Sequence, residues 1–168
     1  MALKVGDAAP DFKLKAAIGE KQGEFQLSQH RGKAVVLLFY ALDFTPVCQN
    51  ELPEFQQRAA DFAAANAELV GINTDTVFSH IAFQKEVGGI SYPIVADRWP
   101  YAEVAKSYGI FPPTTHPVAY SNERAIFVVD KDGKIAWSKV YELGQLPDAQ
   151  EVLEVVRKLA SNSAAAAS

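Results

Sequence analysis

The stretch AVVLLFYALDFTPVCQNEL, residues 34–52, decides the fold of this chain. Its first part, AVVLLFY at 34–40, is a continuous apolar run rich in β-branched and aromatic residues, which is typical of a strand buried on both faces. Its second part opens a helix, because Thr45 is a suitable N-cap and Pro46 suits the first helical position. We therefore predict a strand in the middle of a parallel sheet, followed by a helix that continues to about Ala65.

The sequence on either side continues this alternation of strands and helices. The stretch ELVGINTD at 68–75 predicts a second buried strand, and a helix with Phe78, Ile81 and Ala82 on one face follows it. The remaining expected elements are, in chain order, an N-terminal hairpin at 11–28, a short strand and a short helix within 91–110, a hairpin that turns at Asp132-Gly133 and a last helix that begins at Asp148. This order predicts an α/β protein with a thioredoxin-like fold, to which the N-terminal hairpin and the 91–110 segment are additions.

The last helix is predicted from its capping residues and its apolar face. Asp148 is the expected N-cap, and Glu151, three residues on, completes a capping box. The residues expected on the buried face are Val152, Val155, Val156 and Leu159. We predict one domain over residues 1–160, and the low-complexity segment SNSAAAAS at 161–168 is expected to be a frayed end or an extension of the helix.

Composition restricts the classes of function. The 168 residues carry a net charge of −4 and an isoelectric point near 5.4, which argues against a surface for nucleic acid or an anionic membrane, since such surfaces need clustered Lys and Arg. No apolar run approaches membrane-spanning length, and the opening MALKVGDAAPDF lacks the apolar core of a signal peptide. A single cysteine excludes a disulfide-stapled secreted fold. A cytoplasmic protein is therefore expected.

Cys48 is the candidate for chemistry. With Thr45 as N-cap, Cys48 stands at the third helical position, beside free backbone N–H groups and the positive end of the helix dipole. Such a setting lowers a thiol pKa from about 8.5 to between roughly 3.5 and 7.5. Pro53 is expected to kink the helix, so that the turn carrying Cys48 opens more easily than the segment from Phe55 to Phe62. The alternative is a buried, inert cysteine, since most lone cysteines simply pack.

This stretch resembles the active-site motif of the peroxiredoxins, P-x-x-x-T-x-x-C. Thr45 and Cys48 match the motif, and Glu51 matches the acidic residue that commonly follows. Arg124, at the start of RAIFVVDKDGKI, matches the family's active-site arginine. The similarity covers nearly the whole chain, and CQNEL with ADRWPYAEVAKSYGIF is most similar to the one-cysteine alkyl hydroperoxide reductase E type. One residue departs from the motif: Ala41 replaces the proline, which suggests a less shielded sulfur.

The resemblance implies a thioredoxin-like fold with a peroxiredoxin-type insertion and a thiol-dependent peroxidase activity. The Cys48 thiolate would attack hydrogen peroxide or an organic hydroperoxide and become a sulfenic acid. Arg124, the Cys48 backbone N–H and the Thr45 hydroxyl would stabilise the charge that moves onto the oxygens. Glu51 would orient Arg124 through a charge-assisted hydrogen bond. Without the resemblance, Arg124 is a solvated charge at a strand end and Glu51 an exposed helix residue.

The resemblance also implies the partners of the chain. With no second cysteine, a thiol from outside must resolve the sulfenic acid, and the candidates are a small thiol, a thioredoxin, a glutaredoxin or a mycothiol-like reductant. A homodimer packed through loops near the active site is expected. No nucleic acid, membrane, nucleotide, haem or metal is expected as a partner or cofactor.

Other polar and aromatic residues are expected to have structural roles. Three histidines lack the spacing of metal ligands and are expected to pack or to hydrogen-bond at the surface: His30, His80 and His116. Asp43 and Asp75 lie near strand ends and are interpreted as turn or cap residues. Phe44 and Trp99 are expected in the core or in a subunit contact.

Two other functions are considered. The first is a non-catalytic redox sensor or interaction module on a peroxiredoxin scaffold, with Ala41 marking lost activity. The second, thioredoxin-type disulfide exchange, is disfavoured because it needs C-x-x-C, whereas this chain has C-x-x-E at 48–51. The chain also lacks the proline expected just before the strand of Arg124.

Overall fold

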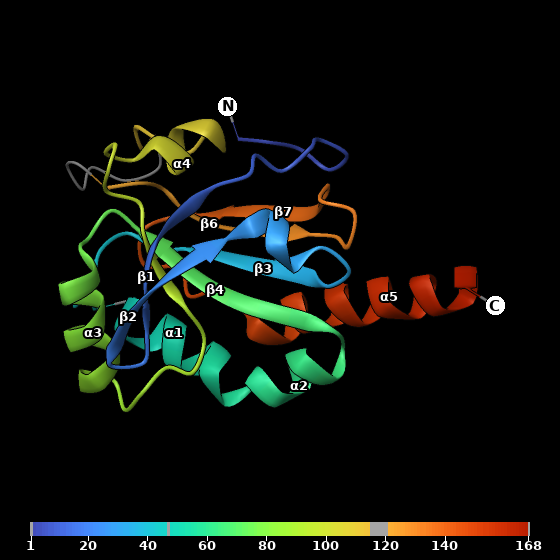
Figure 1. Cartoon of the computed structure of the whole chain (residues 1–168), viewed down its shortest axis with the longest axis horizontal. Helices are drawn as coiled ribbons and strands as arrows, with labels where there is room; N and C mark the ends of the chain where they lie inside the picture. Colours follow the sequence, from blue (N-terminus) through green and yellow to red (C-terminus); the bar gives the residue numbers. More distant parts are fainter. Residues whose placement is uncertain (1, 47, 115–120, 168) are drawn as a thin grey trace.

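The computed structural model of the chain describes residues 2–46, 48–114 and 121–167, without the side chains of Cys48 and of residues 163–167. Within this part, one sheet holds seven strands in the order β2-β1-β5-β4-β3-β6-β7 (Figure 1). The strands are β1 (Lys13–Ile18), β2 (Lys21–Gln26), β3 (Ala34–Phe39), β4 (Ala67–Asn73), β5 (Ile94–Ala96), β6 (Arg124–Val129) and β7 (Ile135–Tyr141). The helices are α1 (Cys48–Gln57), α2 (Ala59–Ala64), α3 (Val77–Glu86), α4 (Glu103–Ser107) and α5 (Ala149–Ala167), with a 3-10 turn η1 (Leu27–His30). This is the element order predicted for a thioredoxin-like fold with an N-terminal hairpin.

Strand β3 lies in the middle of the sheet. All of its residues are buried, which confirms the predicted burial on both faces. It pairs in parallel with β4, where Leu37 faces Val70, and antiparallel with β6, where Leu37 faces Phe127. The prediction of a parallel sheet around β3 is therefore wrong on one side, because the hairpin of β6 and β7 enters the sheet in the opposite direction.

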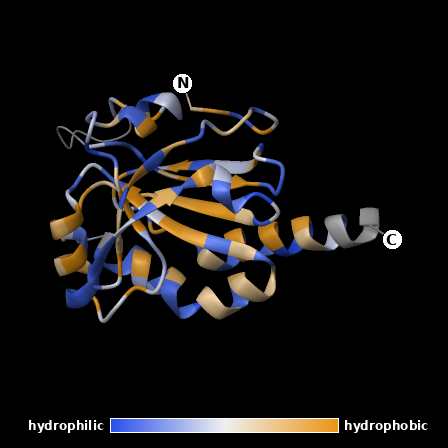
Figure 2. Cartoon of the chain, viewed as in Figure 1, coloured by the Kyte–Doolittle hydropathy of each residue, from blue (hydrophilic) through white to orange (hydrophobic). Residues whose placement is uncertain are grey.

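Alternate residues of β3 face two halves of the core, since successive side chains of a strand point to opposite faces. Val36 and Leu38 pack in the half that also holds buried residues of α1, α2, α3 and α5. Val35, Leu37 and Phe39 pack in the half that holds residues of α4 and of the N-terminal segment. Figure 1 shows α1, α2 and α5 on one side of the sheet and α4 on the other, and Figure 2 shows the middle strands as strongly hydrophobic. The loop that follows β3 thus starts from a strand held on both edges and both faces.

The helix predicted after β3 is divided into α1 and α2. The kink expected at Pro53 does not end the helix, since Pro53 lies inside α1. The break is at Arg58, whose N–H donates to the Phe55 carbonyl, three residues back, at 3.1 Å. This tighter turn allows Phe55 and Phe62 to meet, with 5.9 Å between their ring centroids. That the turn of Cys48 opens first stays a prediction.

Two predicted helix faces need correction. In α3 the buried residues include Val77, His80 and Phe83, whereas Phe78 is 69% exposed, so the predicted face was wrong. In α5 the Asp148 carboxylate accepts from the Gln150 N–H at 2.9 Å, as an N-cap does. Glu151 does not complete the capping box, because its carboxylate pairs with Lys139 instead at 3.2 Å.

The C-terminal segment is an extension of α5, which continues to Ala167. Val152 and Val156 are fully buried as predicted, and Leu153 joins them. Val155 and Leu159 are partly buried against the same half of the core. The division of the chain into a domain over 1–160 and a tail stays a prediction.

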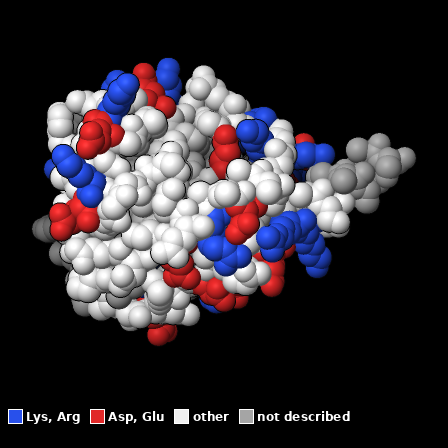
Figure 3. All heavy atoms as spheres, turned by 90° about the horizontal axis from the view of Figure 1, so that it is seen from below, with Lys and Arg blue, Asp and Glu red and all other residues white. Residues whose placement is uncertain are grey.

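The outer surface carries charges of both signs. On the face seen from below, Lys and Arg side chains lie beside Asp and Glu side chains, and neither sign forms a continuous stripe (Figure 3). Among the helices of the described residues, none combines the length and the hydropathy needed to span a bilayer.

Candidate active site

The loop from β3 to α1 carries the predicted nucleophile and its threonine. The Gln49 N–H donates to the Thr45 carbonyl at 2.9 Å, and this first helical hydrogen bond places Thr45 at the N-cap and Cys48 at the third position, as predicted. The Thr45 hydroxyl donates to the Leu42 carbonyl at 2.8 Å, so its oxygen is left to accept a hydrogen bond from a bound peroxide. The predicted contacts of the Cys48 sulfur lie outside the described residues.

The residue that replaces the motif proline is enclosed by the fold. Ala41 is 3% exposed and belongs to the core half that contains α1. The backbone at residue 41 is therefore covered even without a proline ring. The expectation of a less shielded sulfur concerns the Cys48 side chain and stays a prediction.

Glu51 of α1 and Arg124 of β6 meet in the interior. The pairing of β3 with β6 sets Ala125 opposite Phe39, and this register brings Arg124 to the end of β3 from which the Cys48 loop departs. Both side chains are only 1% exposed, with 3.6 Å between Glu51 Oε2 and Arg124 Nη2. The solvated alternatives for these two residues are excluded by this burial.

The buried pair keeps free hydrogen-bonding capacity. Arg124 Nη1 donates to the Glu142 carbonyl at 2.8 Å. Among the described residues, Arg124 Nε, Arg124 Nη2 and Glu51 Oε2 have no hydrogen-bond partner, so the predicted hydrogen bond between Glu51 and Arg124 is not formed at 3.6 Å. Buried polar groups are normally satisfied, and unsatisfied guanidinium donors are suited to the oxygens of a bound peroxide.

The surroundings of Glu51 favour its neutral form. Burial raises the pKa of Glu51 from 4.5 to about 7, although the positive charge of Arg124 acts in the opposite direction. Burial, with a contribution from the Glu51 charge, also raises the pKa of Tyr92 and of Tyr141 well above the ordinary value. Both phenols therefore stay protonated. Of Arg124, Tyr92 and Tyr141, only Arg124 brings a positive charge close to Glu51.

The free energy of unfolding is expected to rise as the pH falls through about 7 towards 4.5, the range between the folded and unfolded pKa of Glu51. In this range the folded protein binds the Glu51 proton more tightly than the unfolded chain does, and preferential binding to the folded state stabilises it. Glu51→Gln should remove this dependence, so the stability difference between the two proteins should change by up to about 3 kcal/mol over the range. Urea titrations of both proteins at several pH values measure it. A difference that is constant with pH contradicts the raised pKa.

The sequence interpretation missed a buried polar cluster beside the loop. Asp43, interpreted as a turn or cap residue, is held by hydrogen bonds from several side chains, including the fully buried His80. Asp75, interpreted in the same way, accepts a hydrogen bond from the Asp43 backbone. A usable signal was position, since Asp43 and Asn73 follow neighbouring parallel strands whose carboxyl ends meet at one edge of the sheet.

The remaining aromatic and histidine predictions have mixed outcomes. Trp99 is 87% exposed, so the prediction that it lies in the core is wrong. Phe44 is 46% exposed, and its ring makes a T-shaped contact with the ring of Phe83. His30 pairs with Glu68, as expected for a histidine that hydrogen-bonds near the surface. His116 lies outside the described residues.

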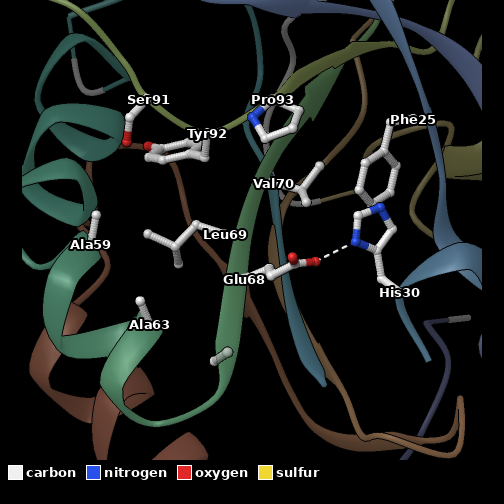
Figure 4. Close-up of a pocket in the computed structure, with 11 residues that line it drawn as sticks. Phe25, His30, Ala59, Ala63, Glu68, Leu69, Val70, Ser91, Tyr92 and Pro93 are labelled. Atoms are coloured by element: carbon white, nitrogen blue, oxygen red, sulfur yellow. Dashed lines mark hydrogen bonds and ion pairs between the residues drawn. The ribbon is translucent and has the colours of Figure 1, made fainter. Parts of the chain in front are cut away.

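A pocket elsewhere in the structure does not contain the predicted site. It lies between α2 and β4, encloses about 260 Å³, and has Phe25 stacked on His30 at its rim (Figure 4). None of the predicted site residues lines it. The loop of Thr45, and not this pocket, therefore stays the candidate site.

Comparison with known proteins identifies the family of the chain. The sequence matches the AhpC/TSA family over residues 5–138. Peroxiredoxin tpx1 of Schizosaccharomyces pombe is 36% identical over 165 residues, which cover 95% of this chain and 81% of that protein. A putative peroxiredoxin of Synechocystis, sll0755, is 35% identical over 163 residues, covering 94% of this chain and 78% of that protein.

Solved structures show the same architecture. The reduced 2-Cys peroxiredoxin of Plasmodium vivax superposes with a TM-score of 0.84 at 27% identity, covering 95% of this chain and 83% of that chain. Mycobacterium tuberculosis AhpC gives a TM-score of 0.84 at 23% identity and covers 96% of each chain. The thioredoxin-like fold is thereby confirmed. Since the family match spans most of the sequence, the chain belongs to the AhpC/TSA family of peroxiredoxins, which are thiol-dependent peroxidases.

Proposed function

We propose that this peroxiredoxin works by a one-cysteine mechanism with Cys48 as the peroxidatic residue, and that it reduces hydrogen peroxide or organic hydroperoxides. The observation that carries the proposal is the buried Arg124, which holds unpartnered donors among the described residues at the end of the strand that leads to Cys48. The backbone position of Cys48, at the start of α1 and three residues after the N-cap Thr45, supports a stabilised thiolate.

The proposed oxidation transfers one oxygen. The Cys48 thiolate attacks the terminal peroxide oxygen, an S–O bond forms, and the O–O bond breaks. Sulfur is oxidised to the sulfenic acid, the peroxide is reduced, and the departing oxygen takes a proton and leaves as water or an alcohol. Arg124 stabilises the charge on both oxygens, and the Thr45 hydroxyl oxygen accepts a hydrogen bond from the peroxide.

Resolution needs a thiol from another molecule, since the sequence contains a single cysteine. The outside thiolate attacks the sulfenic sulfur, water leaves, and a mixed disulfide forms that a second thiol reduces. A small thiol, a thioredoxin, a glutaredoxin and a mycothiol-like reductant are the proposed donors. Some relatives are named 2-Cys peroxiredoxins, so resolution is where this chain is proposed to differ. The alkyl hydroperoxide reductase E subtype stays a prediction.

The decisive experiment is stopped-flow oxidation of the reduced protein by hydrogen peroxide, an alkyl hydroperoxide and peroxynitrite. The exposed Trp99 provides a fluorescence signal. We expect oxidation far faster than that of a free thiol, followed by recovery with candidate thiols. Oxidation as slow as that of free cysteine would reject the proposed peroxidase mechanism at Cys48.

One observation favours a redox sensor as the second candidate: Ala41 stands where the motif has proline. A sensor would be oxidised too slowly for turnover and would then form a stable mixed disulfide with a partner protein. The same stopped-flow series separates the two, because rapid oxidation with repeated turnover excludes the sensor.

We also propose a cytoplasmic homodimer. Large apolar side chains are exposed near the carboxyl ends of the central strands, namely Phe44, Phe78 and Trp99, at 46%, 69% and 87%. Exposed apolar surface of this kind marks protein contacts, and a second copy is the partner that the family resemblance implies. Sedimentation velocity tests it, with a monomer at micromolar concentration as the contrary result.

A further inference from the structure

Asp43 is the most heavily hydrogen-bonded side chain of the loop that carries Cys48. Its side chain is 1% exposed and lies two residues before Thr45. Its carboxylate accepts hydrogen bonds from side chains that follow β3, end β4 and begin α3: Tyr40 Oη at 2.5 Å, Asn73 Nδ2 at 3.2 Å, Ser79 Oγ at 2.8 Å and His80 Nδ1 at 2.8 Å. Three separate parts of the fold therefore fix this one carboxylate.

His80 completes the arrangement as a buried hydrogen-bonding partner. Its side chain is 0% exposed, and its other ring nitrogen, Nε2, lies 3.1 Å from the Val95 carbonyl. Both ring nitrogens of His80 are therefore engaged, one by the Asp43 carboxylate and the other by a backbone carbonyl. Asp43 and His80 thus form an enclosed, hydrogen-bonded pair at the base of the loop.

The Asp43–His80 pair lies beside a backbone conformation that is uncommon for a residue other than glycine. Phe44 has a φ of 65°, in the left-handed region that non-glycine residues adopt only when their surroundings fix it. On one side of Phe44, the Asp43 N–H donates to Asp75 Oδ2 at 2.7 Å. On the other side, the Thr45 hydroxyl donates to the Leu42 carbonyl at 2.8 Å. Asp43 thus anchors the turn that sets Thr45 and the start of α1.

We propose that the Asp43–His80 pair is a positioning device for the peroxidase reaction: His80 holds Asp43, and Asp43 holds the Phe44 turn so that Thr45 and Cys48 stand in reactive geometry. Neither residue needs to touch the peroxide. The inference rests on the peroxidase function proposed above. Misplacement of reacting groups by about 1 Å lowers rates by about 100-fold, so the pair should matter for the rate and not only for stability.

Two substitutions of His80 separate positioning from packing. His80→Asn keeps an amide N–H near the place of Nδ1, which faces Asp43, whereas His80→Gln keeps one near the place of Nε2, which faces Val95. We expect His80→Gln to lower the rate constant for oxidation by hydrogen peroxide by about 10- to 100-fold, and His80→Asn to retain most of the rate. Asparagine is the smaller residue and leaves the larger void, so His80→Asn should nevertheless have the lower thermal stability.

If His80 has only a structural role, the oxidation rate should follow stability, and His80→Asn, the less stable variant, should then be slower than His80→Gln. Alkylation of Cys48 by iodoacetamide needs the thiolate but no stabilisation of peroxide oxygens, so it should change little in either variant. Asp43→Asn tests the other member of the pair and should lower the peroxide rate about as far as His80→Gln. The double variant Asp43→Asn/His80→Gln should have a peroxide rate only a little lower than that of either single variant, since both substitutions remove the same contact.

Asp97→Asn is the matched control. Asp97 is also buried, at 1% exposed, and its carboxylate accepts from the N–H groups of Val104 and Ala105 at 3.0 and 2.8 Å, outside the Cys48 loop. We expect it to lose stability while keeping the peroxide rate. A rate for His80→Asn as low as for His80→Gln, parallel loss of oxidation and alkylation, or an unchanged rate in Asp43→Asn overturns the inference while the wild-type activity stands. Slow oxidation of the wild-type protein instead overturns the proposed function, and the positioning role with it.

Discussion

Cys48→Ser is expected to abolish the rapid reaction with peroxide. A serine hydroxyl is not ionised at neutral pH, and its oxygen has no counterpart of the sulfenic acid. The local backbone should otherwise stay intact, because a hydroxyl can occupy position 48 at the start of α1, beside the same backbone N–H groups. Intact mass after one equivalent of hydrogen peroxide measures the effect: the wild-type protein should gain a single oxygen, and Cys48→Ser should not gain it at a comparable rate.

Met1 provides the internal control for this experiment. The chain has one methionine, and its sulfoxide adds the same mass as a sulfenic acid. The two products differ in reversal, since dithiothreitol reduces the sulfenic acid and leaves the sulfoxide. An oxygen that appears quickly in Cys48→Ser and disappears with dithiothreitol contradicts the role of Cys48. An oxygen that persists in both proteins is assigned to Met1.

The order of strands and helices could be predicted because each element has its own local pattern of apolar residues in the sequence. The run AVVLLFY predicted a strand over 34–40, and β3 occupies Ala34–Phe39. The break at Arg58 could not be predicted in this way, because it depends on how Phe55 and Phe62 pack against each other. The direction of β6 beside β3 is likewise a property of the assembled sheet, and the apolar run of β3 is the same for parallel and antiparallel neighbours.

The candidate site was predictable where a motif names its residues. Thr45, Cys48, Glu51 and Arg124 came from the family resemblance, but the burial of Glu51 and Arg124 and the open guanidinium donors came from the register of β3 with β6. The Asp43–His80 pair was missed for a different reason. The two residues are 37 positions apart, and the sequence interpretation expected His80 only to pack or to hydrogen-bond at the surface, with no named partner.

Arg124→Lys is expected to lower the rate constant for peroxide reduction by about 100- to 1000-fold, the range found when one donor to a developing oxyanion is removed. Arginine has five donors in a planar fork, so it can bind the Glu142 carbonyl through Nη1 and still direct Nε and Nη2 elsewhere. A lysine ammonium keeps the charge but cannot reach both places. Charge alone is therefore not sufficient, and the loss should appear in stopped-flow oxidation but not in alkylation by iodoacetamide.

Arg58→Lys is the control for the loss of a guanidinium. Arg58 is also held by a carboxylate and by a neighbouring element, with Nε 3.1 Å from Asp61 and Nη2 2.6 Å from Gln150, but it lies at the junction of α1 and α2. Its replacement should affect stability and leave the oxidation rate unchanged. If Arg124→Lys oxidises as fast as Arg58→Lys, the open donors of Arg124 do not act on the peroxide. The unsatisfied guanidinium would then be a consequence of burial beside Glu51, and stabilisation of the leaving oxygen would fall to the backbone N–H groups that begin α1.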